Sequence, residues 1–188
     1  RDFCLSRGLG DVYKRQVSQL SLTPARKAML IAGALAVTAT WIYLVLLQPT
    51  NWESVAGSTE ALITLAGYLI GAALLLAGTV PALPARTIAI IPVALVLNIV
   101  VGEIIGSIGV PLYIDAVGTI LVAVLAGPIA GLATGTLSSV VWGLLNPAAL
   151  PFAAVSAATG FLSGLVIKKG AFTKVWWVIL SGAIIGII

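Results

Sequence analysis

Seven apolar stretches separated by short polar segments run through the chain, and this alternation constrains the fold more than any other feature. The stretches cover residues 28–47, 61–80, 87–108, 116–126, 129–145, 152–167 and 175–188. A helix needs roughly 20 apolar residues to cross a bilayer, with about 17–25 tolerated. Hydrophobic residues make up 60% of the chain and charged residues 9%, whereas a soluble domain carries roughly 25% charged residues. The sequence therefore predicts an all-α fold, a polytopic membrane helix bundle of about seven transmembrane segments.

The first sixteen residues differ from the rest of the chain. They hold four of the ten basic residues and the only cysteine, Cys4, and they show no helical or strand periodicity. The stretch SRGLGDVYKRQ, from Ser6 to Gln16, resembles the translation of a transposon-based sequencing adaptor. We therefore expect Arg1–Gln16 to be a read-through artefact outside the fold, and we expect both natural termini to be missing.

The basic residues indicate how the chain crosses the membrane. Cytoplasmic loops of membrane proteins carry an excess of lysine and arginine. When the apolar stretches alternate in direction, every basic residue after the leader falls on one side: Arg26, Lys27, Arg86, Lys168, Lys169 and Lys174. The four acids after the leader, Glu53, Glu60, Glu103 and Asp115, fall toward the other side. We expect the basic side to be cytoplasmic.

The composition also excludes several classes of function. The chain has no histidine, and without the leader it has no cysteine. Histidine-based catalysis, the usual zinc motifs and thiolate metal sites are therefore excluded. Without the leader the formal charge falls from +4 to +2, because four basic and two acidic residues go with it. We expect no nucleic-acid partner, no metal, no cofactor and no enzymatic activity.

Glycines recur at four-residue spacing in several of the apolar stretches. Such stripes allow helices to approach closely in lipid. Packing within one bundle and docking of a partner subunit both account for them. The stripes are Gly67 with Gly71; Gly127 with Gly131 and Gly135; Gly160 with Gly164; and Gly182 with Gly186. Ala85 and Ala89 repeat the spacing at the cytoplasmic start of stretch 87–108, where a partner could reach them.

Three polar residues of the third and fourth stretches are candidates for a site. Asn98 lies near the bilayer midplane and must face the bundle interior, either to bond a neighbouring helix or to contact a ligand. Glu103 lies farther out, where an acid can reach the headgroups or serve a functional site. Asp115 directly precedes the stretch 116–126, so it either caps that helix, with Thr119 one turn on, or contacts a ligand.

Three further residues lie on the same predicted outer side. Tyr113 and Asp115 belong to the segment that would cover a small-molecule pocket. Trp142 has the position of an interface anchor, and Asn146 before Pro147 that of a turn. Because all of these groups collect on one side of the membrane, a substrate-binding site that faces outward is the functional alternative to these structural roles.

From Thr87 onward, the order of segments resembles that of an S component of an energy-coupling factor (ECF) transporter. In that family, a Tyr- and Asp-containing segment follows an outer loop, and a Gly-Pro-x-x-Gly turn joins the next two helices. This chain has Tyr113, Asp115, Gly118 and Thr119 in the first motif and Gly127-Pro128 with Gly131 in the second. The resemblance implies that residues 87–188 form an S-component core without its sixth helix. Residues 17–86 would form two additional N-terminal helices.

The resemblance also implies a function. Such a subunit captures a vitamin or similar small solute from outside and hands it inward. Its partners are a transmembrane coupling subunit, which Ala85 and Ala89 would contact, and two ATPase subunits. The chain itself would be a multi-pass protein of the cytoplasmic (inner) membrane. The chain itself has no Walker motif of the G-x-x-x-x-G-K-[ST] type. The alternative is the membrane-embedded input domain of a sensor protein, such as a histidine kinase.

Overall fold

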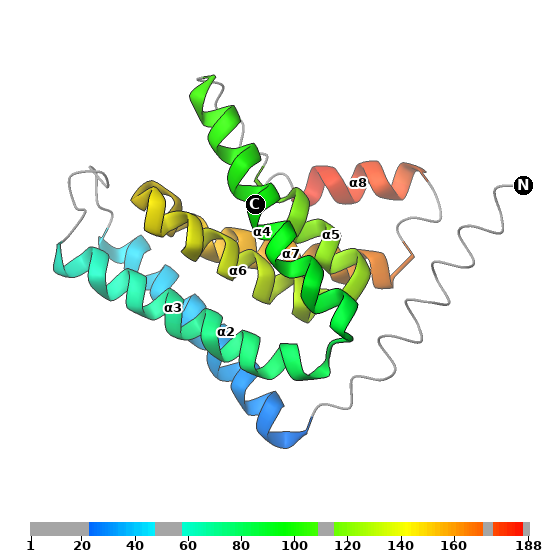
Figure 1. The fold of residues 1–188 in the computed structure, drawn as a ribbon, viewed down its shortest axis with the longest axis horizontal. Coiled ribbons are helices and arrows are strands. Elements are labelled where there is room, and N and C mark those ends of the chain that lie inside the picture. The colour runs from blue at the N-terminus through cyan, green and yellow to red at the C-terminus, as the bar shows by residue number, and fades with distance from the viewer. Residues whose placement is uncertain (1–22, 48–57, 109–114, 171–174, 186–188) are drawn as a thin grey trace, which may run out of the picture.

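The chain folds into a bundle of α-helices, seen in a computed structural model that describes residues 23–47, 58–108, 115–170 and 175–185 (Figure 1). All of the regular elements in these ranges are helical. The α-helices are α2 (Pro24–Leu47), α3 (Thr59–Thr79), α4 (Ala85–Ser107), α5 (Val117–Ala126), α6 (Pro128–Leu145), α7 (Ala153–Lys168) and α8 (Val175–Ile185). Two short 3-10 helices, η2 (Val80–Ala82) and η3 (Pro147–Phe152), continue α3 and precede α7.

The helices correspond one to one with the seven predicted apolar stretches. In the described part of the chain, five segments are long and apolar enough to cross a membrane: α2, α3 with η2, α4, α6, and η3 with α7. Helix α5 has 10 residues and α8 has 11, and both are too short by this measure. The structure thus confirms an all-helical bundle of the membrane type, but the count of seven spans stays a prediction.

Helices α2 and α3 form an antiparallel pair. A Cβ atom added to Gly33 would lie 2.9 Å from the Leu75 side chain. One added to Gly71 would lie 2.7 Å from Val37. Residue numbers rise along one helix as they fall along the other. The start of α2, with its basic residues, therefore lies beside the end of α3.

Helices α6 and α7 form a second, tighter antiparallel pair. A Cβ atom on Gly131 would lie 2.5 Å from the carbonyl oxygen of Gly160. Farther along, the Ser139 hydroxyl donates a hydrogen bond of 2.8 Å to the Ser156 hydroxyl. For these glycines, packing within the bundle is the explanation that the structure confirms. Helix α3 also packs against α6, so the N-terminal pair shares one apolar core with α6 and α7.

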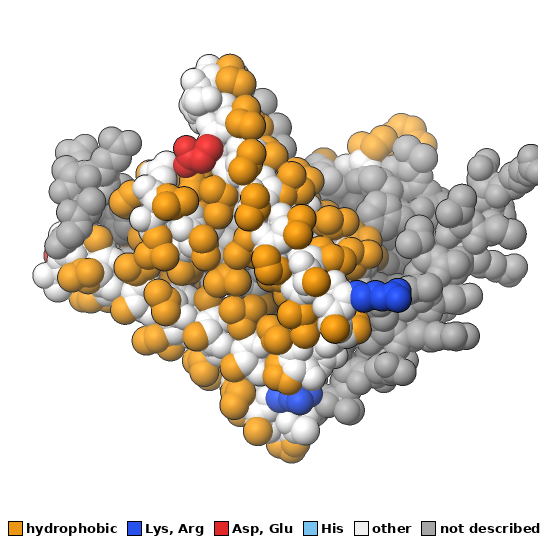
Figure 2. Space-filling view, viewed as in Figure 1, with side chains coloured by type: hydrophobic (Ala, Val, Ile, Leu, Met, Phe, Trp, Pro, Cys, Tyr) orange, Lys and Arg blue, Asp and Glu red, His pale blue; other side chains and the backbone are white. Residues whose placement is uncertain are grey.

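Helix α4 runs parallel to α6 and antiparallel to α5. Asn98 lies next to Ser138, and one turn later Gly102 lies next to Trp142. The starts of α4 and α6 therefore lie at the same end of the bundle as the end of α7. In the space-filling view, Lys and Arg side chains appear at the lower right and acidic ones at the upper left (Figure 2). This separation agrees with the predicted sidedness.

Candidate functional site

Asn98 joins three helices at the centre of the bundle. Its side chain is only 1% exposed. The amide nitrogen Nδ2 donates to Thr119 Oγ1 of α5 at 2.8 Å and to Ser138 Oγ of α6 at 3.1 Å. The carbonyl oxygen Oδ1 accepts from the backbone N–H of Gly118 at 2.6 Å. Of the two roles predicted for Asn98, the structure confirms the interhelical hydrogen bonds.

The Asn98 carbonyl also acts as the cap of α5. The cap residue of this helix is Ala116, whose side chain offers no hydrogen bond. A capping side chain normally accepts from the second or third N–H of the helix. In α5 the second N–H belongs to Gly118, and an oxygen from another helix accepts it. The close approach of the two helices requires glycine at position 118, because a Cβ atom there would overlap the backbone of Ala94.

The predicted capping role of Asp115 is therefore wrong. Asp115 precedes the cap residue Ala116, and Asn98 already occupies the N–H of Gly118 that it would accept. Thr119 likewise bonds Asn98 rather than joining a cap. Asp115 is half-buried. Burial raises the pKa of the Asp115 carboxyl above its ordinary value, while a backbone hydrogen bond opposes this rise.

Glu103 and Trp142 are paired between α4 and α6. The indole Nε1 of Trp142 donates to Glu103 Oε1 at 2.5 Å, and the indole ring covers Gly102. Glu103 is otherwise exposed, and Trp142 is half-buried. The carboxylate thus keeps hydrogen-bonding capacity beyond the indole, since an ionised carboxylate has about four acceptor positions.

The remaining predicted residues lie at the edges of this region. Asn146 is exposed, and its Oδ1 accepts from the N–H of Ala148 at 3.2 Å, which confirms the predicted turn. Tyr113 lies outside the described residues. Ala85 and Ala89 are both exposed near the start of α4, one turn apart, so that face is open in this chain.

The short length of α5 shapes the outer part of this region. Ten residues give a helix of about 15 Å, roughly half a bilayer core. Because α5 begins beside Asn98, the last turns of α4 continue past it toward Glu103 and Ser107. A Cβ added to Gly106 would meet nothing within 4 Å. We use the name α4–α6 junction for two features one turn apart: the Glu103–Trp142 pair, and the Asn98 network at the start of α5, which Asp115 precedes. It combines two carboxylates, an indole and a buried amide.

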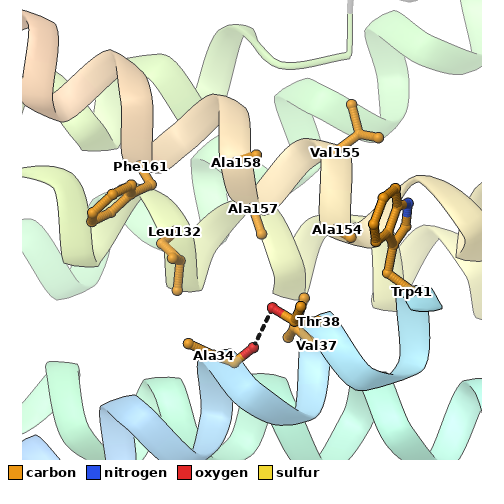
Figure 3. Close-up of a pocket in the computed structure, with 10 residues that line it drawn as sticks. All are labelled: Ala34, Val37, Thr38, Trp41, Leu132, Ala154, Val155, Ala157, Ala158 and Phe161. Carbon is orange, nitrogen blue, oxygen red and sulfur yellow. Dashed lines mark hydrogen bonds between the residues drawn. The ribbon is translucent and has the colours of Figure 1, made fainter.

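Sequence reasoning missed two features of the packing between helices. The hydroxyls of Tyr68, Thr134 and Ser163 are buried with no hydrogen-bond partner. A groove of about 340 Å³ lies between α2, α6 and α7 (Figure 3), and none of the predicted site residues lines it. Neither feature has a signal in the sequence, because each depends on how distant helices meet.

Comparison of the chain with models of protein families, with curated proteins and with solved structures finds no match. The class of protein is therefore defined by the fold alone. A bundle with five helices long and apolar enough to span is that of a multi-pass membrane protein. Among the described residues, no three His, Cys, Asp or Glu side chains gather in a way that could hold a metal ion.

Proposed function

We propose that this chain is the substrate-binding membrane subunit of an ECF-type importer in the cytoplasmic membrane. The observation that carries the proposal is the α4–α6 junction. There, a half-buried acid whose carboxyl pKa is raised lies just before α5, and an acid bonded to an indole lies in the last turns of α4, away from Arg86 at the start of that helix. Ionisable groups within membrane segments are functional candidates by default.

The junction suits a small, flat, polar solute. Glu103 and Asp115 supply acceptors for N–H or O–H groups, and the indole of Trp142 supplies a surface against which a ring can stack. The buried Asn98 network holds α4, α5 and α6 at fixed spacing beneath it. Such a preorganised base favours tight binding, because less conformational entropy is lost on capture.

Handover would require partners. The exposed Ala85 and Ala89 support a small-residue face for a coupling subunit at the basic end of the bundle. Because the chain has no Walker motif, two separate ATPase subunits would supply the energy. The proposal makes the chain a capture subunit without catalytic activity of its own.

The test is solute binding by the purified protein. Mass spectrometry of small molecules released from the protein identifies the solute, and calorimetry then measures its affinity. We expect Asp115→Asn to weaken binding by roughly tenfold, the loss of about 1.4 kcal/mol that one charged hydrogen bond accounts for. Glu103→Gln should also weaken it.

The matched control is Glu60→Gln. Glu60 is an acid on the same predicted side, in the first turn of α3 and exposed, so its removal should leave the affinity unchanged. If Asp115→Asn folds normally and binds the solute as the parent does, the role of Asp115 is wrong. Purification with a soluble kinase domain, and without ATPases, would favour the sensor alternative.

A further inference from the structure

The starts of α2 and α4 lie close together at one end of the bundle. A Cβ atom added to Gly78, in the last turn of α3, would lie 3.2 Å from the backbone oxygen of Arg26 in α2. Only residues 80–84 separate the end of α3 from the start of α4, and Arg86 lies in the first turn of α4. Lys27 and Arg86 are exposed, and Arg26 is half-buried. We call Arg26, Lys27 and Arg86 the basic corner.

Among the described residues, no acid balances the charge of the basic corner. Neither α2 nor α4 has an acidic residue in its first turn, and residues 80–84, VPALP, contain none. Glu60 lies in the first turn of α3 and Glu103 near the end of α4, so each lies at the end of its helix farther from the corner. Asp115 precedes α5, which begins beside Asn98 in the middle of α4. In Figure 2 the acidic side chains of this face lie apart from the Lys and Arg side chains.

Helix polarity adds to this positive charge. The N-terminus of a helix is partly positive, because its first N–H groups have no partner within the helix. Basic side chains are therefore favoured in the last turn of a helix and disfavoured in the first. Lys168 has the favoured position, in the last turn of α7, whereas the three residues of the basic corner have the disfavoured one. An anion bound at the corner would relieve this repulsion.

Exposed apolar side chains continue from the basic corner along the same helix faces. Helices α2 and α4 are both long and apolar enough to cross a membrane, so their first turns reach the level of the lipid headgroups. Ile31 follows Lys27 by four residues and Val93 follows Arg86 by seven, so each pair shares a helix face. Ile31 is 62% exposed and Val93 is 65% exposed. Each exposed cation of the corner is thus followed by an apolar surface that lipid chains can cover.

These two features together identify one kind of ligand. We propose that the basic corner binds the headgroup of an anionic phospholipid, whose acyl chains lie along the exposed faces of α2 and α4. The guanidinium of Arg86 donates to the phosphate oxygens, and Lys27 adds a second charge. A free phosphate ion would use the cations alone, and a zwitterionic lipid would bring its own cation to a region already rich in them. The proposal goes beyond the proposed solute site and does not depend on it.

The experiment measures the preference of the protein for anionic over zwitterionic lipid. The full chain is purified in mild detergent with equal amounts of phosphatidylglycerol and phosphatidylcholine that have the same acyl chains, and native mass spectrometry gives the ratio retained. We expect phosphatidylglycerol to dominate. Arg86→Gln and Lys27→Gln should each lower that ratio by roughly fivefold, because one basic residue near an anionic surface contributes about 1 kcal/mol.

Lys169→Gln is the matched control. It removes an exposed cation at the end of α7, outside the basic corner, so the ratio should stay near that of the parent. A second control combines Arg86→Gln with Glu60→Gln, which restores the net charge of the parent and should leave the ratio low. Circular dichroism establishes that each variant is folded.

The proposal is overturned if the parent retains the two lipids in equal amounts. It is also overturned if Lys169→Gln lowers the ratio as much as Arg86→Gln does, or if the double variant regains the ratio of the parent, because charge in general would then explain the preference. If inorganic phosphate added during the exchange removes the preference, the occupant is a free anion, and the proposal is wrong as well.

Discussion

Asn98 shows how one polar residue organises an apolar bundle. Its amide donates twice, and its carbonyl accepts from the first turn of α5, so three helices share one side chain. In a hydrocarbon environment an amide must find such partners. Those partners fix the position of α5 along the axis of α4. If α5 shifted along that axis, the N–H of Gly118 would lose its acceptor.

Replacing Asn98 should therefore destabilise the protein. Asn98→Leu would leave the N–H of Gly118 without its acceptor in a buried position, which costs about 1–3 kcal/mol. Unfolding in mixed micelles, followed by circular dichroism against added denaturing detergent, measures the change in free energy.

Thr134→Val is the matched control for Asn98. Thr134 is fully buried on α6, and its hydroxyl has no partner. Replacing that hydroxyl with a methyl group removes a buried polar atom that makes no hydrogen bond, so the free energy of unfolding should stay the same or rise. Equal losses in the two variants would contradict the central role of the Asn98 network.

At the scale of elements, contact between α6 and α7 depends on glycine. Helices in lipid gain little from apolar burial against one another, so they rely on close backbone packing. Gly131 faces Gly160, and Gly135 faces the backbone of Ser156. The four-residue spacing thus produces a continuous strip along which the two backbones meet.

A methyl group in this strip should separate the helices. Gly131→Ala would place a Cβ atom 2.5 Å from a backbone oxygen of α7, and such overpacking typically costs about 1–3 kcal/mol. Thermal unfolding in detergent provides the comparison.

Gly106→Ala tests the same substitution where α4 has open space. Nothing lies within 4 Å of its added Cβ, so the better helix propensity of alanine should leave stability unchanged or raise it by up to about 1 kcal/mol. A loss at Gly106 as large as that at Gly131 would rule out the packing explanation.

For the whole molecule, the helix directions and the charges agree on one orientation. Helix α4 runs parallel to α6, and α6 runs antiparallel to α7. The start of α4, with Arg86, and the end of α7, with Lys168, therefore lie at one end. Apolar side chains cover much of the surface between the two charged ends (Figure 2).

Cysteine labelling tests this orientation. In a background with Cys4→Ser, Arg86→Cys and Lys168→Cys should react with a membrane-impermeant maleimide only after the cells are permeabilised. Glu60→Cys, at the start of α3, should react in intact cells, because the positive-inside rule places the basic end in the cytoplasm. Labelling of Arg86→Cys and Lys168→Cys from opposite faces would refute the orientation.

The amino-acid sequence by itself determined the helices and their limits. Each predicted apolar stretch became a helix whose described ends differ by a few residues at most, as in 61–80 against Thr59–Thr79. The reason is physical: length, hydropathy and the Gly127-Pro128 turn act locally along the chain. The glycine strips were also legible, because their spacing follows from helical geometry.

Only the tertiary structure decided what the polar residues do. Asp115 has the sequence position of a cap, yet the side-chain oxygen of Asn98, twenty residues before Gly118, caps α5 instead. The pairing of Glu103 with Trp142 and the groove beside Trp41 likewise join segments far apart in the chain. Such contacts depend on which helices become neighbours and on how those helices are shifted along their axes relative to one another. The pattern within any one helix does not carry that information.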